Sequence, residues 1–289
     1  MEIQTPFLKN EGTQLLHFNG VQMGFVRRGK PSSTSTLVLL HGFTGSAESW
    51  GSLLDTFADR GFQTIALDML GHGQSSTPTD PERYSIEHCR VDILAALQQL
   101  GIAPQQAILL GYSMGGRVAL YTALSSPFRA LILESASPGQ PDPTERVQRQ
   151  QRDNALADRI EREGVLNFID YWQDIPLFVS QQNMPDGRRA AQRAQRLNNT
   201  PLGLANSLRG LGTGVQPPLH KHLQELMMPV LLLAGGLDNK FCTIAHQMAD
   251  QIPNAQLEIV PDAGHTVHLE QPERFIEIVH AFSTSLIDP

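Results

Sequence analysis

Short apolar runs alternate with amphipathic stretches along most of the chain. The apolar runs have the character of buried strands, and they are Thr36–Leu40, Gln63–Asp68, Ala107–Leu110, Ala130–Leu133, Pro229–Ala234 and Gln256–Val260. Between them, apolar residues recur at helical spacing in Ala47–Arg60, Ser85–Leu100, Gly115–Ser125, Ile244–Ile252 and Pro272–Ile287. This alternation predicts an α/β fold, in which a mostly parallel sheet is flanked by crossover helices.

The beginning of the chain departs from this order. Two short segments, Leu15–Phe18 and Gln22–Val26, flank the pair Asn19-Gly20. Because Asn-Gly favours the positive φ angles of a tight primed turn, we predict an antiparallel hairpin ahead of the parallel strands.

A long stretch in the middle of the chain contains helical sequence but no convincing strand. It runs from about Pro138 to Gln224 and is interrupted by proline and glycine. We interpret residues 138–218 as a helical cap inserted after a strand, and residues 1–137 and 219–289 as the core domain. Ten of the chain's 18 arginines lie in this stretch, and acidic residues nearly match them in number. Most of these arginines are therefore expected on solvated helix faces with local ion pairs.

A G-x-S-x-G motif joins one predicted strand to the helix that follows it. Ser113 stands between Gly111 and Gly115, directly after an apolar run. Glycines at these positions allow the sharp strand-to-helix turn that exposes the serine hydroxyl. The N-terminal end of the following helix also favours developing negative charge. We therefore predict that Ser113 is the nucleophile or the base of an active site.

An acid and a histidine follow this serine in the chain order typical of such sites. Asp238 ends a glycine-rich loop after one apolar run, and His265 follows the next apolar run. Loops after neighbouring strands bring the two side chains together, so that one imidazole nitrogen meets the carboxylate and the other meets Ser113. Glu134, at the end of another predicted strand, is the alternative acid. We favour Asp238, because the preceding Gly-Gly pair gives its loop the freedom to reach His265.

Two backbone amides are candidates for an oxyanion hole. Phe43 follows His41-Gly42 at the end of the first parallel strand, and Met114 follows the serine. Their N–H groups are expected to face one oxygen on which negative charge develops. The segment Asp68–Ser75 reads D-x-x-G-x-G-x-S, and we interpret it as a structural loop beside the serine turn.

Charge and composition narrow the range of partners. The 289 residues carry a formal charge of −7, which opposes a nucleic-acid or anionic-membrane partner. The sequence shows no signal-peptide pattern at its start and no apolar stretch long enough to span a bilayer. Cys89 and Cys242 lack metal-ligand spacing and are expected to be reduced thiols. These features predict a cytoplasmic protein. No motif for a metal, a flavin or a nicotinamide is present, so we expect no cofactor, and we expect a monomer or weak homo-oligomer.

Several segments together resemble one family of α/β-hydrolase-fold enzymes, the 2-succinyl-6-hydroxy-2,4-cyclohexadiene-1-carboxylate (SHCHC) synthases of menaquinone and phylloquinone biosynthesis. In the core the similar segments are Leu40–Gly45, Asp68–Ser75, Arg83-Tyr84-Ser85, Gly111–Arg117, Asp238-Asn239-Lys240-Phe241 and Ala263–His268. In the cap they are Arg149 ahead of Asp153, Tyr171-Trp172 ahead of Pro176-Leu177-Phe178, and Arg196-Leu197-Asn198-Asn199. The likeness covers nearly the whole chain from about residue 35, and Arg117 and the cap segments carry its specificity.

The resemblance implies a lyase that eliminates pyruvate from 2-succinyl-5-enolpyruvyl-6-hydroxy-3-cyclohexene-1-carboxylate, with the serine–histidine pair removing a ring proton. This substrate is a small polyanion, and arginine side chains bind carboxylates bidentately. The substrate-binding residues implied in this way are Tyr112, Arg117, Arg149, Trp172, Arg196 and Lys240. Considered without the resemblance, Arg149 and Arg196 fit solvated helix faces better, and Trp172 fits core packing better.

The serine, the histidine and the acid alone predict a different and commoner chemistry. Their default reaction is hydrolysis of an ester, a thioester or a carbon–carbon bond. A carboxylesterase or carbon–carbon bond hydrolase of the same fold is therefore the alternative enzyme. A catalytically silent binding protein of this fold is a third possibility, which the presence of all three residues opposes.

Overall fold

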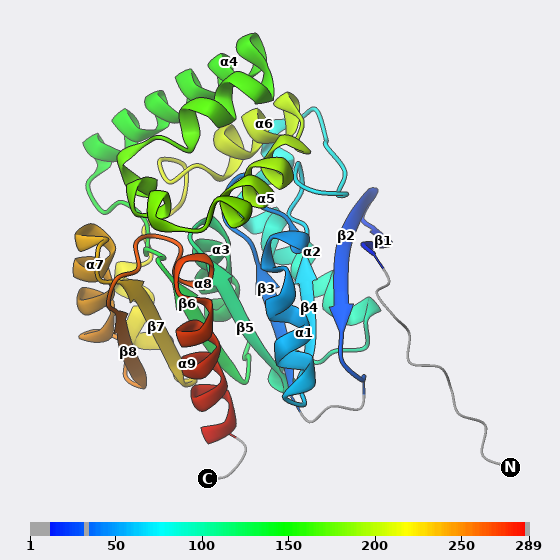
Figure 1. Ribbon diagram of the computed structural model, residues 1–289, viewed down its shortest axis with the longest axis vertical. Coiled ribbons are helices and arrows are strands. Elements are labelled where there is room, and N and C mark those ends of the chain that lie inside the picture. The colour runs from blue at the N-terminus through cyan, green and yellow to red at the C-terminus, as the bar shows by residue number, and fades with distance from the viewer. Residues whose placement is uncertain (1–11, 32–34, 287–289) are drawn as a thin grey trace, which may run out of the picture.

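The computed structural model describes residues 12–31 and 35–286, which contain an eight-stranded sheet with helices on both sides (Figure 1). In sheet order the strands are β1 (Gln14–Phe18), β2 (Val21–Arg28), β4 (Gln63–Leu67), β3 (Thr36–Leu40), β5 (Ala107–Tyr112), β6 (Ala130–Glu134), β7 (Val230–Gly235) and β8 (Ala255–Val260). β1 and β2 pair antiparallel with their neighbours, and every pairing from β4 to β8 is parallel. The six apolar runs predicted as strands are confirmed, and so is the α/β class.

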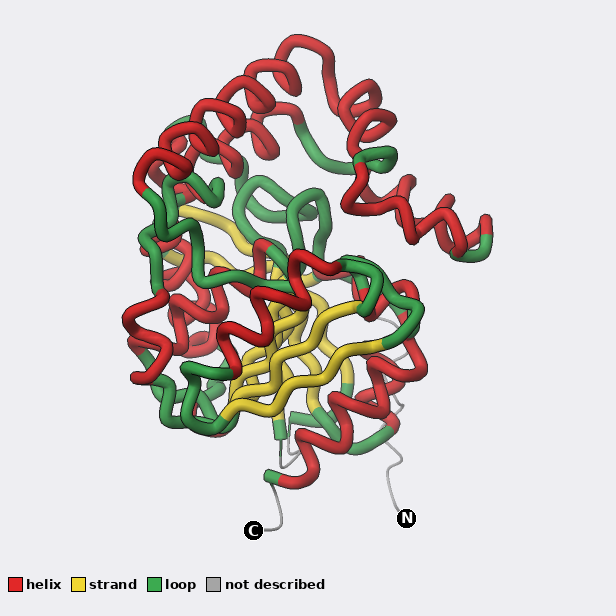
Figure 2. The backbone as a smooth tube through the Cα atoms, turned by 90° about the vertical axis from the view of Figure 1, so that its left-hand side faces the viewer, coloured by secondary structure: helices red, strands yellow, loops and turns green. Residues whose placement is uncertain are grey.

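Side chains of the parallel strands alternate between two apolar layers. One face of the sheet is covered by α2 (Ile86–Gln99), α3 (Met114–Ser125) and α7 (Asn239–Ala249), and the other by α1 (Ser52–Asp59) and α9 (Pro272–Ser285). In β3, Val38 and Leu40 pack into the first layer, whereas Leu37 and Leu39 pack into the second. Figure 2 shows helices on both sides of the strands. Because both faces are covered, the central strands β3, β5, β6 and β7 are mostly apolar and fully buried along nearly their whole length. Four shorter helices lie in the connections, namely η1 (Ala47–Trp50), η2 (Pro81–Tyr84), η3 (Pro104–Gln106) and α8 (Val267–Glu270).

The predicted hairpin at the start of the chain is confirmed. β1 and β2 are joined at Asn19 and Gly20, whose φ angles are 51° and 73°. Two consecutive positive φ angles define the primed turn that suits the twist of the flanking strands.

Between β6 and β7 the described chain forms helices and no strand. These helices are α4 (Pro143–Trp172), η4 (Pro176–Asn183), α5 (Asp186–Leu197), α6 (Pro201–Leu211) and η5 (His220–Glu225). α4 and α6 share a small apolar core in which Ile160, Phe168 and Leu204 are fully buried. In Figure 1, α4, α5 and α6 lie together over one end of the sheet. A helical insertion therefore follows β6 as expected, while its limits as a domain, residues 138–218, stay a prediction.

Arginines on the surface of this insertion form ion pairs with nearby carboxylates. The pairs are Arg159–Glu163, Arg162–Glu163, Arg189–Asp186, Arg193–Asp170, Arg209–Asp158 and Arg209–Glu161. The prediction of solvated helix faces is confirmed for these residues, and solvent-exposed pairs of this kind add little stability.

Two helices differ from their predicted extents. The helix expected over Ala47–Arg60 is divided at Gly51, whose φ of 48° interrupts the helical backbone. The helix expected from Ile244 begins earlier, at Asn239, because the Asp238 side chain accepts a hydrogen bond from the Phe241 amide and caps it.

Some predictions fall on residues outside the described ranges. They concern the signal-peptide pattern at residues 1–11 and the end of the last helix at Ile287. Within residues 12–31 and 35–286, no helix combines the length and the apolar composition that crossing a membrane requires.

Candidate active site

Ser113 lies at the turn between β5 and α3 with a backbone φ of 51°. This left-handed conformation is strained for a serine and persists because the surroundings are tightly packed. A Cβ atom on Gly115 would collide with the carbonyl oxygen of Leu40, and one on Gly111 would collide with the carbonyl oxygen of Gly115. Both glycines are therefore required for the turn that carries Ser113.

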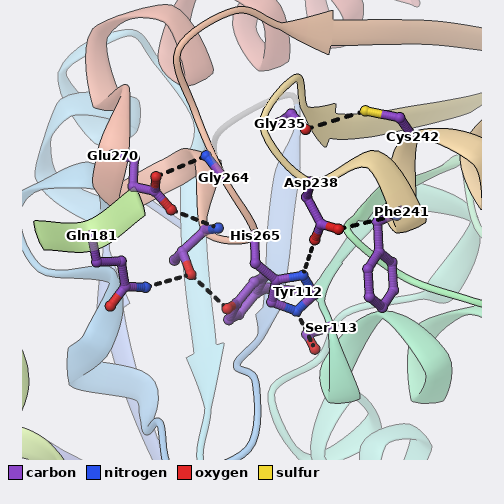
Figure 3. A network of polar contacts seen from close by, with 11 residues as sticks. Tyr112, Ser113, Gln181, Gly235, Asp238, Phe241, Cys242, Gly264, His265 and Glu270 are labelled. Carbon is purple, nitrogen blue, oxygen red and sulfur yellow. Dashed lines mark hydrogen bonds and ion pairs between the residues drawn. The ribbon is translucent and has the colours of Figure 1, made fainter. Parts of the chain in front are cut away.

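The side chains of Ser113, His265 and Asp238 form a hydrogen-bonded chain (Figure 3). His265 Nε2 lies 3.0 Å from Ser113 Oγ, and His265 Nδ1 lies 2.7 Å from Asp238 Oδ2. Both the imidazole and the carboxylate are buried, with 1% and 8% of their side-chain surfaces exposed. In this arrangement Asp238 accepts a hydrogen bond from the Nδ1–H group, which leaves Nε2 able to take a proton from the serine.

Two loops at the ends of β7 and β8 bring the acid and the histidine together. The Gly236 amide donates to the Val260 carbonyl at 2.8 Å, and the Leu237 amide donates to the Ala263 carbonyl at 2.9 Å. These backbone bonds tie the Asp238 loop to the His265 loop. The Asp238–His265 contact is therefore built into the backbone of two adjacent strands.

Glu134, the alternative acid, contacts a different histidine. Its carboxylate accepts from the amide of His268 at 3.0 Å and lies 2.8 and 2.9 Å from His268 Nδ1. Glu134 is fully buried, and the His268 ring packs against Trp50 at a centroid distance of 4.5 Å. Of the two candidate acids, the geometry therefore joins Asp238 to His265 and gives Glu134 to His268.

The two residues predicted to form an oxyanion hole share a cavity with Ser113. Phe43 and Met114 both line the cavity into which Ser113 opens. Met114 is the first residue of α3, so its amide has no acceptor within the helix. The loop before Phe43 is fixed by His41, whose Nδ1 donates to the Gly42 carbonyl and whose Nε2 accepts from the Met69 amide. The pairing of the two amides around one oxygen stays a hypothesis.

Two buried histidines beside this loop, His41 and His72, are expected to lower the free energy of unfolding of the protein in acid. Burial lowers the pKa of His41 to about 4 and that of His72 to about 3, so both are neutral in the folded chain at pH 7. In the unfolded chain each takes up a proton as the pH falls through about 6.5. Between about pH 6.5 and 4 the unfolded chain therefore binds more protons at these two histidines than the folded chain does. The free energy of unfolding therefore falls by about 1.4 kcal/mol per pH unit for each histidine.

Urea denaturation at pH 7 and pH 5 measures this loss of stability. The variant His72→Asn cannot titrate at that position, so its free energy of unfolding is expected to fall less than that of the wild type. An equal fall in both proteins would contradict the assignment of His72.

The cavity beside Ser113 has a volume of about 160 Å³ and concentrates positive charge. Five of the predicted substrate-binding residues line it, namely Tyr112, Arg117, Arg149, Trp172 and Lys240. Three of these five are cationic, and none of the described lining residues is acidic. A negatively charged ligand at this position is therefore electrostatically favoured.

Arg117 is a buried cation held by neutral groups. It is 8% exposed, and its guanidinium donates to Gln216 Oε1 at 2.6 Å and to the Leu211 carbonyl at 2.8 Å. Burial, with a smaller contribution from nearby Arg149, lowers the pKa of Arg117 to about 10, so it remains protonated at neutral pH. No carboxylate of the described chain forms an ion pair with it. Its charge is thus available to a bound carboxylate.

Arg149 and Lys240 lie at more open positions of the same cavity. Arg149 Nε donates to Asp153 Oδ1 at 2.8 Å, one helical turn further along α4, and the side chain is 40% exposed. Lys240 Nζ lies 5.6 Å from the centroid of the Phe241 ring. Arg149 therefore combines a helix-surface ion pair with a place in the cavity wall.

Arg196 lies apart from these cations. It lines a second cavity, of about 380 Å³, which shares Phe43, Tyr112 and Phe178 with the Ser113 cavity as common walls. Arg196 is 6% exposed and packs 5.1 Å from the centroid of the Phe178 ring. Among the described residues its guanidinium has no hydrogen-bond or ion-pair partner, and burial lowers its pKa. The resemblance implies that Arg196 and Arg117 both bind the substrate, and the structure places Arg196 in the adjoining cavity and not in the one that Ser113 lines.

Several polar residues of the site carry no motif in the sequence. Gln216 holds Arg117, Gln181 donates to Thr266, and Glu270 accepts from the amides on either side of His265. Of these residues, only Thr266 could have been noticed in the sequence, because it directly follows the predicted histidine. In the described chain, no group of three or more His, Cys, Asp and Glu side chains is arranged to hold a metal ion.

Comparison with known proteins first defines the class. The family model described as alpha/beta hydrolase fold matches residues 35–272, in agreement with the sheet and with the serine turn at its centre.

Comparison with individual proteins then defines the family. The chain is 44% identical over 270 residues to the putative SHCHC synthase of Bacillus subtilis (strain 168), covering 93% of this chain and 97% of that protein. It is 32% identical to the SHCHC synthase of Serratia proteamaculans (strain 568), covering 88% and 93%. A solved structure of MenH from S. aureus matches with a TM-score of 0.86 and 33% identity, over 92% of this chain and 99% of that one. The chain belongs to the α/β-hydrolase fold family and, within it, to the SHCHC synthases, as the resemblance predicted.

Proposed function

We propose that this enzyme is a lyase that eliminates pyruvate from 2-succinyl-5-enolpyruvyl-6-hydroxy-3-cyclohexene-1-carboxylate to give SHCHC. The relatives at 44% and 32% identity carry the name of this activity. The observation in the structure that carries the proposal is the cavity beside Ser113, which holds Arg117, Arg149 and Lys240 and no described acid. A substrate with several carboxylates matches such a cavity, whereas a simple neutral ester has no need of it.

The hydrogen-bonded side chains supply the base for this elimination. His265 Nε2 withdraws the proton of Ser113, and the serine oxygen in turn takes a proton from a ring carbon of the substrate. The C–H electron pair enters the ring π system, the bond to the enolpyruvyl oxygen breaks, and enolpyruvate leaves as an anion. The imidazolium of His265 then gives up its proton, and enolpyruvate takes up one proton at its methylene carbon to become pyruvate. Asp238 stabilises the imidazolium that forms for part of this cycle.

The oxyanion hole has a defined task in this reaction. The acidic ring C–H lies next to the succinyl ketone, so negative charge develops on that carbonyl oxygen as the proton leaves. The amides of Phe43 and Met114 would donate to this oxygen, with the N-terminal end of α3 behind them. Stabilisation at this point acts on the transition state more than on the bound substrate.

The two cavities together fit the size and charge of the substrate. The Ser113 cavity of about 160 Å³ is smaller than a typical small-molecule site of roughly 300 Å³ or more, whereas the second cavity is about 380 Å³. We therefore place the reacting part of the ring near Arg117, and one carboxylate-bearing arm beyond Tyr112, where it reaches Arg196.

An assay for pyruvate tests the proposed function. Wild-type enzyme given the enolpyruvyl substrate is expected to release pyruvate in a coupled reaction with lactate dehydrogenase, and Ser113→Ala is expected to release almost none. Aryl acetates serve as the parallel substrate for the alternative hydrolase. Rapid cleavage of these esters without any pyruvate release would replace the lyase by a carboxylesterase.

We further propose a cytoplasmic location and a small polyanion as the partner. Both described cysteines, Cys89 and Cys242, are free thiols, as is usual in a reducing compartment. Recovery of the native enzyme from an oxidising compartment, by cell fractionation, would contradict this location.

A further inference from the structure

A second hydrogen-bonded group joins the immediate neighbours of Ser113 and His265 (Figure 3). Tyr112 precedes the serine and Thr266 follows the histidine, and their side-chain oxygens lie 2.7 Å apart. Gln181 Nε2 donates to the same Thr266 oxygen at 2.9 Å. Three segments that are distant in the sequence thus meet at one buried hydroxyl, which is part of a residue only 1% exposed.

Gln181 belongs to η4 of the helical insertion, which packs directly on the histidine loop. A Cβ atom on Gly264 would collide with Ser180 Oγ, so only a glycine permits this approach. The Phe178 ring, also from η4, lies 6.0 Å from the His265 ring in an edge contact. The insertion therefore contacts three consecutive residues of this loop, namely Gly264, His265 and Thr266.

The core holds the same loop from the other side. Glu270 Oε2 accepts from the Gly264 amide at 2.7 Å, and Glu270 Oε1 accepts from the Thr266 amide at 3.1 Å. One carboxylate thus fixes the backbone on both sides of His265. Among the described residues, the hydrogen-bond partners of the Thr266 side chain are Tyr112 and Gln181.

The chemistry of Gln181 sets the direction of its bond to Thr266. An amide nitrogen such as Gln181 Nε2 can only donate, so Thr266 Oγ1 accepts from it. The threonine hydroxyl is then held in the orientation in which it meets the Tyr112 hydroxyl. Tyr112 in turn contacts the His265 ring, at a centroid distance of 5.6 Å.

We propose that Gln181 and Thr266 are positioning residues that hold Ser113 and His265 at reacting distance, so that alignment of the catalytic pair depends on docking of η4. The proposal rests on the Ser113–His265 pair of the proposed function, and it adds two residues that do not touch the reacting atoms. Small displacements of a catalytic group cost large factors in rate, which makes such a connection effective.

Reaction of Ser113 with a fluorophosphonate measures the alignment without the natural substrate. The serine oxygen forms a bond to phosphorus, fluoride leaves, and His265 takes the serine proton. The inactivation rate constant therefore reports on the Ser113–His265 pair even if the proposed lyase activity is absent. kcat and KM for pyruvate release provide the second measurement.

Two matched pairs of variants isolate the contacts. Gln181→Leu removes the donor, and Gln182→Leu makes the same change at the exposed neighbouring residue. Thr266→Val removes the hydroxyl but keeps the shape, whereas Thr266→Ser keeps the hydroxyl. We expect Gln181→Leu and Thr266→Val each to lower the inactivation rate constant and kcat by about tenfold or more, with KM changed by less than about threefold. Gln182→Leu and Thr266→Ser are expected to stay near the wild type.

The double variant adds a further requirement. Because both residues act through one hydroxyl, Gln181→Leu with Thr266→Val is expected to lose about as much as either single change. Lower melting temperatures with unchanged inactivation rates would show a merely structural role and overturn the proposal. Equal effects of Gln181→Leu and Gln182→Leu would do the same. If Gln181→Leu does not fold, the Thr266 pair decides alone, and a wild-type enzyme that resists the reagent overturns the proposal together with the catalytic pair.

Discussion

Replacing Asp238 by asparagine is expected to lower kcat/KM for pyruvate release by about 10³–10⁴-fold. The carboxylate accepts a hydrogen bond from the Nδ1–H group of His265 at 2.7 Å, which fixes the tautomer whose unprotonated Nε2 faces Ser113. An asparagine amide can donate to Nδ1 instead, and this places the proton on Nε2, where it blocks proton transfer from the serine. Steady-state kinetics with the coupled pyruvate assay measures the loss, and circular dichroism checks that the fold is retained.

Glu134→Gln is the matched control, since it makes the same chemical change in the alternative acid. Glu134 is bonded to His268 and not to His265, so kcat/KM is expected to fall by less than about tenfold. The melting temperature is expected to fall, because a fully buried charge-assisted contact is weakened. A loss as large as that of Asp238→Asn would transfer the role of triad acid to Glu134.

Replacing Arg117 by alanine is expected to lower kcat/KM by roughly 30- to 1000-fold, which corresponds to about 2–4 kcal/mol of lost transition-state binding. Arg117 is the most buried of the three cations beside Ser113, and none of its hydrogen bonds is to a carboxylate. The loss arises from the missing contact with a carboxylate of the substrate. For neutral aryl esters, if their cleavage is measurable, kcat/KM is therefore expected to change far less.

Two further variants separate charge from packing at this position. Arg117→Lys retains the charge but not the planar fork, and it is expected to recover part of the lost activity. Arg162→Ala removes an exposed arginine that pairs with Glu163 on α4, and it is expected to leave kcat/KM unchanged. If Arg117→Ala keeps the wild-type catalytic efficiency while it folds, Arg117 does not belong to the substrate site.

The core of the fold and the hydrogen-bonded arrangement of Ser113, His265 and Asp238 were predictable because local rules determine them. Strands covered on both faces are continuously apolar, so β3, β5 and β7 are visible as runs in the sequence. The turn at Ser113 needs glycines on both sides, and this requirement is itself a motif. The chain order of serine, acid and histidine then followed from the order of the strands.

Other features depend on tertiary contacts that leave no pattern in the sequence. Arg196 sits on an arginine-rich amphipathic helix, and the residue spacing of α5 does not show that it enters a separate compartment. Gln181 and Gln216 are ordinary polar residues of the insertion until packing brings them to Thr266 and Arg117. The division of the predicted helix at Gly51 likewise depends on a positive φ that glycine allows but does not impose.

The close approach of Ser180 to Gly264 also limits how this enzyme can change. A side chain at position 264 has no space while Ser180 lies against it, so the core and the insertion share one steric constraint. An insertion transplanted from another hydrolase would have to bring a small residue to this point and a donor to the place of Gln181. Chimaeras that exchange the whole insertion are therefore expected to pack poorly where residues 180 and 264 meet, even if the core and the insertion are each well packed. Exchanging the histidine loop together with the insertion is expected to avoid this.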